Sequence, residues 1–434
     1  MRFGIFYEHQ LPRPWAPDSE RQLFQDALDQ VELADRLGLD YAWEVEHHFL
    51  EEYSHSSAPE VFLAAASQRT RHIRLGHGIV LMPPGYNHPA RVAERLATLD
   101  LVSNGRVDWG TGESASRAEL EGFRVAPGER RAMWREAVEQ TANMMVMDPY
   151  PGFQGKYFTM PCRNVVPKPV QKPHPPLWVA CSNRETIHLA AQLGIGALTF
   201  AFVDPSEARH WVEDYYTTFE RECVPIGHAV NPNIAMVTGF SCHRDADEAQ
   251  RRGADGFRFF QFALAHHYVF GKHTPGRTNI WTAFEKVREQ LGTEVLGGGV
   301  GCIGTPERLR ETLAIFDKAG VDQTIFIQQG GRNRHEHICE SLELFAADVM
   351  PEFREKDAAR QAQKMERLGP AIEAAFERKQ ALAPAPEDGS TTYEAYGNTV
   401  ALTDEDIAKM PEGNRRRVLT FRKIRAIAED AQGR

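Results

Sequence analysis

The sequence predicts a (β/α)8 barrel, because short apolar runs alternate with longer segments of helical period along most of the chain. The eight candidate strands are residues 3–7, 40–46, 73–80, 106–109, 177–180, 197–200, 234–240 and 324–328. An open doubly wound sheet would produce a similar alternation. No G-x-G-x-x-G motif follows a strand, however, and reactive side chains stand where several strands stop, so we favour the barrel.

The elements follow one another as repeated strand and helix units. The strand at 3–7 leads into a helix at 20–37, in which Leu23, Ala27, Val31 and Ala34 share one face and Gly38 closes the last turn. Each later strand is followed sooner or later by a segment of helical period. Two connections are longer than one unit needs, a Pro- and Gly-rich stretch at 147–177 and another at 246–305. Long excursions in a barrel usually form the roof on the substrate side, so we expect both as insertions at the C-terminal face.

Size and charge limit the class of protein. With 434 residues and 42% hydrophobic content, the chain can form one barrel-sized domain and an appendage. The 50 Lys and Arg against 60 Asp and Glu give a net charge of -10, which disfavours nucleic acid or an anionic membrane as partner and favours a small molecule. We expect a soluble cytoplasmic protein, since no apolar stretch has the length of a secretion signal or a membrane span. The 6 cysteines include no C-x-x-C pair, which indicates reduced thiols.

The excursion at 246–305 is dense in aromatic side chains. They are Phe257, Phe259, Phe260, Phe262, His266, His267, Tyr268, Phe270 and Trp281. Such a segment suits a mobile cover over an apolar ligand, and it suits ordinary helix packing equally well. On the first interpretation, the candidate substrate contacts are Phe6, Glu46, His48, Phe200, Phe259 and Phe262.

Composition changes after residue 355. Residues 356–380 form a charged, Ala-rich helical segment, 381–389 a Pro-containing linker and 415–428 a basic helical segment. We therefore predict two parts, a barrel at 1–355 and an extension at 356–434. The extension is either an arm for subunit contacts or partly disordered chain.

Polar side chains without a packing role follow four consecutive strands. The second strand ends in Glu46, His47 and His48, and the third passes through His77, Gly78 and Ile79. The fourth strand runs into residues 110–114 and the fifth into residues 181–186. Because the C-terminal strand ends of a barrel meet at one rim, these loops predict an active site inside that rim.

The fourth and fifth strand ends are candidates for anion binding. Hydroxyl groups and free backbone N–H groups at a helix start form an anion cradle, and Ser182, Asn183 and Thr186 stand where a strand stops and an Ala-rich helix begins. Ser182 or Asn183 could equally serve only as the helix cap. The two roles are compatible.

The adjacent histidines His47 and His48 are candidates for proton transfer. On extended backbone their side chains point to opposite faces, so only one faces the barrel mouth, where it can donate or accept a proton near neutral pH. Metal binding is the rival interpretation. The first strand is followed by Glu8, His9 and Gln10 rather than by an H-x-H motif, and His335 and His337 lie two apart in a helical segment, so we expect no metal.

The order of several segments resembles the bacterial luciferase-like flavin-dependent monooxygenase family, a superfamily of barrels that also contains deazaflavin-dependent enzymes. The resemblance covers about residues 1–354. The segments are RFGIF at 2–6, EHHF at 46–49, IRLG at 73–76, SNGR at 103–106, PPLWVA at 175–180, AAQLG at 190–194, GTPE at 304–307 and AGVD at 319–322. Their order and coverage together make the resemblance specific.

The resemblance implies roles for individual residues. His47 matches the catalytic histidine that manages protons near the flavin ring, and residues 77–80 match a segment that often contains a non-prolyl cis peptide beneath that ring. The implied cofactor-binding residues are His77, Gly78, Ile79, Thr111, Ser114, Arg117, Ala180, Ser182, Asn183 and Thr186. The reactive cysteine and following arginine of luciferase are replaced by about Gly112 and Glu113, so Arg184 or Arg117 could take over the phosphate contact.

The resemblance also implies an activity. We expect a two-component monooxygenase in which an NAD(P)H-dependent reductase supplies reduced FMN, O2 forms a C4a-peroxyflavin, and a small apolar substrate is oxygenated. A homodimer is implied as well. Two alternatives stay open, an F420-dependent hydride-transfer oxidoreductase and a catalytically silent flavin-binding protein. Aldehyde, ketone, terpene and aromatic substrates, and hydroxylation against Baeyer-Villiger-type insertion, are not distinguished by these side chains.

Overall fold

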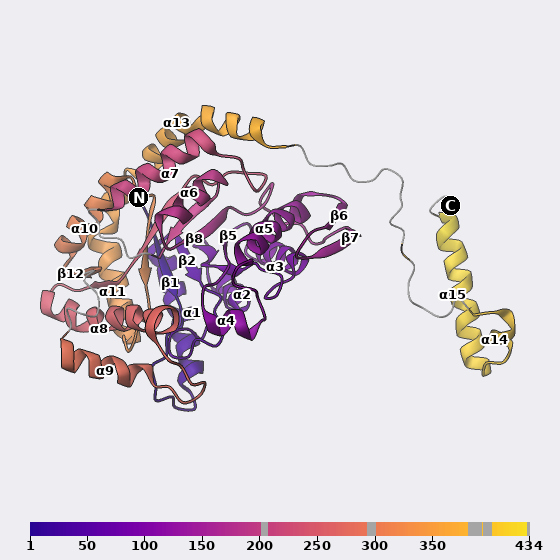
Figure 1. Cartoon of the computed structure of the whole chain (residues 1–434), viewed down its shortest axis with the longest axis horizontal. Coiled ribbons are helices and arrows are strands. Elements are labelled where there is room, and N and C mark those ends of the chain that lie inside the picture. Colours follow the sequence, from indigo (N-terminus) through magenta and orange to yellow (C-terminus); the bar gives the residue numbers. More distant parts are fainter. Residues whose placement is uncertain (201–206, 293–300, 381–392, 394–401, 432–434) are drawn as a thin grey trace. The chain divides into compact units, whose positions relative to one another are not determined.

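The computed structural model describes residues 1–200, 207–292, 301–380, 393 and 402–431. Within them, parallel strands form a closed barrel, which confirms the predicted fold class (Figure 1). Its strands are β1 (Arg2–Tyr7), β2 (Tyr41–Glu44), β3 (Arg74–His77), β5 (Val107–Gly112), β8 (Leu177–Cys181), β9 (Gly196–Thr199), β10 (Ile234–Thr238) and β13 (Gln323–Ile327). Each pairs with its neighbour along the chain, and β13 pairs with β1 to close the ring. The short strand β4 (Val80–Leu81) extends the barrel by pairing with β5, so the predicted strand at 73–80 is two strands separated by Gly78 and Ile79.

Helices cover the outside of the barrel. They are α1 (Ser19–Leu37), α2 (Pro59–Arg69), α3 (Pro89–Val102), α4 (Arg117–Gly122), α5 (Arg130–Val146), α6 (Arg184–Gln192), α7 (Ala208–Glu222), α10 (Pro306–Ala319), α11 (His335–Asp348) and α12 (Met350–Arg354). Pro59, Pro89 and Pro306 each begin a helix, where the missing N–H group has no cost. As predicted, Gly38 ends α1, with a φ of 86° that glycine adopts without strain.

Side chains along each strand alternate between the helix layer and the barrel interior. Trp43 of β2 and Trp178 of β8 fill the interior, with ring centroids 5.4 Å apart and the rings edge to face. Gly76 and Gly196 lie on the neighbouring strands, and a Cβ atom at either position would overlap one of these indole rings. The two glycines are therefore what gives the tryptophans their space.

The excursion at 147–177 begins and ends at the N-terminal face of the barrel, and its middle packs along the outside of α5, where Lys156 contacts Glu129 and Glu136, so its predicted place in the substrate-side roof is wrong. It contains a hairpin of β6 (Tyr150–Gln154) and β7 (Thr159–Arg163) and connects α5 to β8. A connection from a helix to the next strand ends where that strand starts. Gln171 shows this position, since it accepts a hydrogen bond from Arg74 at 3.0 Å and donates one to the Val107 carbonyl at 2.8 Å, at the first residues of β3 and β5.

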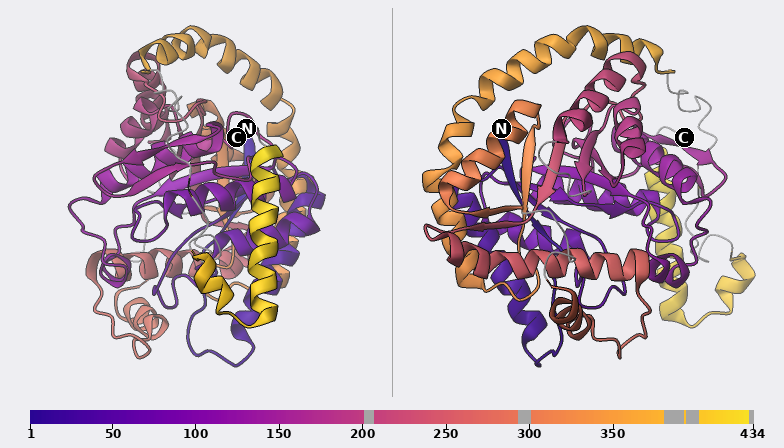
Figure 2. Two further views of the ribbon diagram at one scale, coloured as in Figure 1. Left: turned by 90° about the vertical axis from the view of Figure 1, so that its right-hand side faces the viewer. Right: turned by 60° about the vertical axis from the view of Figure 1, so that its left-hand side comes forward.

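The excursion at 246–305 lies at the C-terminal face, as predicted, because it follows a barrel strand. Its described residues contain α8 (Ala246–Ala265), a π-helical turn η1 (His266–Phe270), α9 (Ile280–Leu291) and β12 (Cys302–Gly304), and β11 (Phe240–Cys242) ends just before it. Figure 1 and both views of Figure 2 place α8 and α9 at one end of the barrel and α13 (Asp357–Arg378) at the other.

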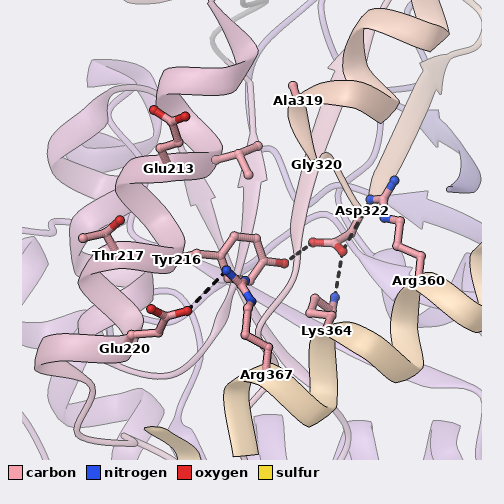
Figure 3. Close-up of a pocket in the computed structure, with 11 residues that line it drawn as sticks. Glu213, Tyr216, Thr217, Glu220, Ala319, Gly320, Asp322, Arg360, Lys364 and Arg367 are labelled. Atoms are coloured by element: carbon pink, nitrogen blue, oxygen red, sulfur yellow. Dashed lines mark hydrogen bonds and ion pairs between the residues drawn. The ribbon is translucent and has the colours of Figure 1, made fainter.

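The helix α13 is attached to the N-terminal face by charged and apolar contacts. The Lys364 ammonium lies 2.7 Å from Asp322 Oδ1, and the Tyr216 hydroxyl donates to Asp322 Oδ2 at 2.5 Å. Figure 3 shows these three side chains lining a pocket between α7 and α13. Leu368 and Ala375 of α13 are buried in the main core.

The contacts divide the chain into two compact units, Met1–Ala385 and Pro386–Arg434. The predicted boundary after residue 355 therefore falls inside the first unit, because α13 packs on the barrel. The second unit contains α14 (Asp404–Ala408), which Thr403 caps, and α15 (Glu412–Ala431), which contains the predicted basic helix. The predicted linker at 381–389 lies outside the described residues. Among the helices that are described, none combines the length and apolarity needed to cross a membrane.

Candidate active site

The candidate site is built around His47, just beyond the C-terminal end of β2. The extended backbone after Glu44 turns the two histidines to different sides, as predicted. His47 Nδ1 lies 3.0 Å from Glu119 Oε1, whereas His48 Nε2 lies 3.2 Å from Glu46 Oε1. The His47 backbone N–H donates to the Ser56 carbonyl at 2.8 Å, which holds this residue in place.

Glu119, on α4, is the first of two carboxylates beside His47. It is fully buried and accepts hydrogen bonds from the His48 backbone N–H at 2.9 Å and the Ser114 hydroxyl at 2.5 Å. Burial disfavours its charge, but the His47 imidazole and these donors overcome that effect and lower the pKa of Glu119. Glu119 is therefore an anion that holds His47 through Nδ1.

Glu8, immediately after β1, is the second carboxylate. Its Oε1 accepts a hydrogen bond from the Tyr53 hydroxyl at 2.9 Å, and its Oε2 lies 3.8 Å from His47 Nε2. Burial raises the pKa of Glu8 to about 7 in spite of the nearby His47. Burial would lower the pKa of His47, yet the charges of Glu8 and Glu119 outweigh it and raise that pKa to about 9. The two carboxylates thus favour the imidazolium form of His47, which can give a proton.

Glu46 and His48 brace the loops beside the site. Glu46 Oε2 accepts from the Leu81 backbone N–H at 2.8 Å, and its Oε1 accepts from Asn87 Nδ2 at 2.9 Å. The His48 ring packs on Phe123 at a centroid distance of 4.8 Å. The polar atoms of both predicted substrate contacts are thus engaged by protein groups other than His47.

Small residues line the top of the barrel interior next to this network. Gly78 faces Phe6 and Trp43, Gly112 faces Ile79, and Ala180 packs in the same apolar cluster. A Cβ atom at Gly78 would lie 3.3 Å from the Phe6 ring, and one at Gly112 would overlap Ile79. The Phe6 and Phe200 rings are 5.2 Å apart, so these two predicted substrate contacts share one wall.

The insertion places two members of the predicted aromatic set near His47, but not the two that we expected to contact substrate. Tyr268 of η1 lies 6.4 Å from the His47 ring, measured between centroids, and Phe260 of α8 lies 5.5 Å from Tyr53. Phe259 packs instead on Trp281 and Phe284 of α9, and Phe262 packs on Phe270 and Phe284. Phe259 and Phe262 therefore pack in the interface between the helices, and their contact with substrate stays a prediction.

Several predicted cofactor-binding residues make contacts within the protein away from His47. The Thr111 hydroxyl donates to the Trp178 carbonyl at 2.9 Å and accepts from Trp134 Nε1 at 3.1 Å, so it faces the helix layer. Alternation along β3 directs His77 outward too, where burial lowers its pKa to about 4. Arg117 is 87% exposed and pairs with Glu121. The cis peptide bonds among the described residues all precede proline, so the expected non-prolyl cis bond at 77–80 is absent there.

The predicted anion cradle starts α6. Asn183 Oδ1 accepts from the Thr186 backbone N–H at 3.0 Å, and Thr186 Oγ1 accepts from the Asn183 N–H at 3.3 Å, so both residues serve as the cap. Ser182 is exposed at this helix start. Burial raises the pKa of the neighbouring Cys181 thiol to about 12, an effect that Arg131 of α5 partly opposes, which places a guanidinium near the same strand end.

Sequence reasoning missed Glu8, Tyr53 and Glu119 as parts of this site, whereas Tyr268 was among the aromatic residues of the expected cover. Glu8 carried a signal, since a charged residue directly follows an apolar strand. Glu119 carried none, because Glu113 and Glu121 nearby have the same chemistry and only the folded loop selects among them. Ser114 is linked to His47 through Glu119, and within the described residues Ser182 makes no hydrogen bond to this network. In the described parts of the chain, no three His, Cys, Asp or Glu side chains converge as metal ligands would.

A barrel with an imidazole between two carboxylates at its C-terminal rim defines an enzyme site. The family model for luciferase-like monooxygenases matches residues 1–323. A flavin-dependent trigonelline monooxygenase, oxygenase component, from Acinetobacter baylyi is 26% identical over 83% of this chain and 98% of its own length. Limonene 1,2-monooxygenase from Rhodococcus erythropolis is 26% identical over 81% of this chain and 86% of its own.

Among solved structures, monooxygenase RslO1 from Streptomyces bottropensis superposes with a TM-score of 0.67 at 27% identity, over 81% of this chain and all of that one. This chain belongs to the luciferase-like monooxygenase family. The family match and the names of these relatives confirm the predicted enzyme class, a monooxygenase.

Proposed function

We propose that this chain is the oxygenase component of a two-component flavin-dependent monooxygenase, which uses reduced FMN and O2 to oxygenate a small apolar organic substrate. The observation that carries the proposal is the position of His47, held between Glu8 and Glu119 at the barrel rim. Reduced FMN, supplied by a separate NAD(P)H-dependent flavin reductase, provides the electrons that activate dioxygen. The relative from Acinetobacter baylyi, itself named an oxygenase component, supports this arrangement.

The residues at the strand ends fit a flat tricyclic ring. The ring would lie over the strand ends near Gly78 and Ala180, where the side chains are smallest, and above Ile79, which fills the space beside Gly112. Phe6 and Phe200 supply an apolar wall beside them. These residues would hold the flavin ring, while His47 supplies the proton that the oxygen chemistry requires.

The start of α6 would hold the flavin phosphate. Its backbone N–H groups carry the positive end of the helix dipole, and the Ser182 hydroxyl is exposed next to them. Among arginines, Arg131 and Arg184 fit this site better than Arg117, because the first lies near Cys181 and the second begins the helix. We infer from the aromatic cover and the Phe6 wall that the substrate is apolar, and from the family that the protein is a homodimer.

A binding and turnover experiment tests the proposal. The purified chain is titrated anaerobically with reduced FMN, with oxidised FMN and with F420, and oxygen uptake is then followed with NADH, a flavin reductase and a panel of ketones, terpenes and aromatic compounds. We expect reduced FMN to bind most tightly and at least one panel member to gain an oxygen atom. A His47→Gln variant should bind reduced FMN normally and lose most of its oxygenated product.

Each alternative gives a different result in the same experiment. Preferential binding of F420 would replace the proposal with a hydride-transfer oxidoreductase. Tight FMN binding without any product, unchanged in His47→Gln, would indicate a catalytically silent flavin-binding protein. Failure to bind either cofactor would exclude all three functions, the monooxygenase, the hydride-transfer oxidoreductase and the silent flavin-binding protein. Native mass measurement determines whether the chain is a dimer.

A further inference from the structure

We propose that Glu8 is a positioning residue for His47, whose carboxylate keeps a proton on Nε2, the ring nitrogen that Glu119 does not contact. The inference rests on the proposed function and deepens it, because it identifies what keeps His47 an acid. Glu8 acts through the imidazole rather than on the substrate. It was not among the residues that the sequence suggested.

The geometry around Glu8 singles it out. Its side chain is 3% exposed, and Oε2 has no hydrogen-bond partner among the described residues, a costly arrangement for a buried carboxylate. That oxygen faces His47 Nε2 at 3.8 Å, a distance at which charge attraction is strong in a site of low polarity. The other oxygen is fixed by the Tyr53 hydroxyl, and the Ser54 hydroxyl donates to the Glu8 carbonyl at 2.8 Å. Glu8 therefore cannot swing toward another cation without breaking these contacts.

The His47 side chain is 15% exposed and packs against groups from several elements that bear on its charge. From α4 comes Glu119, from the end of β2 comes Glu46, and from the loop after β2 comes Tyr53. The turn η1 contributes Tyr268 and His267, and Glu44 of β2 acts on Glu8. Burial raises the pKa of Tyr53 and of Tyr268 well above that of free tyrosine, so both stay neutral hydroxyls. Glu8, an anion above its pKa of about 7, is thus the carboxylate nearest to Nε2.

Glu119 and Glu8 each lie beside a different nitrogen of the His47 imidazole. Glu119 holds Nδ1 by a hydrogen bond at 3.0 Å, which orients the ring, while Glu8 stabilises the charge from the Nε2 side without hydrogen bonding to it. The Nε2 proton therefore remains available to a reactant. With Glu8 neutralised, burial would favour the uncharged imidazole, and the site would lose its acid near neutral pH.

The test measures His47 directly and does not depend on catalysis. Histidine-labelled protein is titrated by NMR without cofactor, with the His47→Gln spectrum used to assign the signal. In Glu8→Gln we expect the midpoint of His47 titration to fall by about 1–3 pH units, the size of an opposite charge at this distance. Glu8→Asp should restore part of the difference. Glu121→Gln is the matched control, since this exposed residue of α4 pairs with Arg117 and should leave the midpoint unchanged.

The pH dependence of kcat/KM provides the second readout. The alkaline limb should move toward neutral pH by the same amount in Glu8→Gln, so that activity at pH 8.5 falls about threefold for a shift of one unit and more than a hundredfold for three, while activity at pH 6 falls by about twofold at most. A loss that is equal at every pH, with the NMR midpoint unchanged, would overturn the inference and leave Glu8 a purely structural residue. If Glu8→Gln shifts the NMR midpoint of His47 but the wild-type protein has no oxygenase activity, the role of Glu8 stands and the proposed function is rejected. Thermal unfolding of each variant confirms that it is folded.

Discussion

The carboxylate of Glu52 accepts a hydrogen bond from the backbone N–H of Ile280 at 2.5 Å, which ties the loop after β2 to the first turn of α9. The same carboxylate accepts from the N–H groups of Trp281 at 3.1 Å and Arg13 at 2.9 Å. Glu52 is fully buried, and its negative charge lies at the positive end of the helix dipole. One side chain thus connects the segment that carries His47 and Tyr53 with the insertion that covers them.

Replacing Glu52 should loosen this cover. In Glu52→Ala three backbone N–H groups lose their acceptor in a buried place, so we expect the free energy of unfolding to fall by about 1–3 kcal/mol or more. Urea unfolding measures this loss. Protease cleavage within 271–279 should also become faster, because the start of α9 is no longer anchored. Glu289→Ala, an exposed position on the same helix, should stay within about 0.5 kcal/mol of wild type. Equal stability of the two variants would contradict the anchoring role.

The sequence predicted the barrel because every strand leaves a local signal, an apolar run followed by a helical period. The position of the excursion at 147–177 was predicted wrongly for a topological reason. A long connection after a strand reaches the C-terminal face, whereas one after a helix, such as that after α5, reaches the other face.

The candidate site was only partly predictable. His47 was found because it follows a strand, and Gly78 and Ala180 lie where the strand ends placed them. Glu119 could not be found, since its contact with His47 depends on how the loop between β5 and α4 folds. Phe259 and Phe262 were placed at the substrate because aromatic density has the same signature in a cover and in a helix interface.

The barrel interior should tolerate no side chain opposite Trp43. A Cβ atom at Gly76 would overlap the indole, so Gly76→Ala forces the ring or the strand to shift, and we expect a loss of about 1–3 kcal/mol. Chemical unfolding followed by tryptophan fluorescence measures it. Gly128→Ala is the control, because a Cβ atom there meets nothing within 4 Å. A Gly76→Ala protein as stable as wild type would mean that Trp43 is free to repack.

Acid should destabilise the protein partly through His174. Its Nε2 accepts from the His228 backbone N–H at 2.8 Å and its Nδ1 lies 2.9 Å from the Pro175 carbonyl, an arrangement that only the neutral ring satisfies. Burial lowers the pKa of His174 from 6.5 to about 4. Between pH 6.5 and pH 4 the unfolded chain therefore carries a proton on His174 that the folded chain lacks. The stability that is present above pH 6.5 is lost as the pH falls toward 4.

The difference in unfolding free energy between pH 7 and pH 5 should shrink by about 2 kcal/mol in His174→Gln, because this variant no longer titrates there. Its stability at pH 7 should itself be lower than that of wild type. The exposed His210→Gln should keep the wild-type difference. An unchanged difference in His174→Gln would assign acid sensitivity to other groups, such as His77, whose pKa burial also lowers to about 4.

Two truncations distinguish the possible ends of the barrel domain. A chain ending at residue 380 keeps α13, with Leu368 and Ala375 in the core and Lys364 on the buried Asp322, and should unfold in one transition close to that of the full chain. A chain ending at residue 355 loses all three contacts and leaves the Asp322 charge without its ammonium partner, which typically costs about 3–5 kcal/mol for a buried pair. We therefore expect the shorter chain to melt much earlier or to aggregate, as measured by calorimetry and light scattering. If both truncated chains melt at the same temperature, α13 adds no stability to the barrel. The domain boundary would then lie at 355, as the composition predicted.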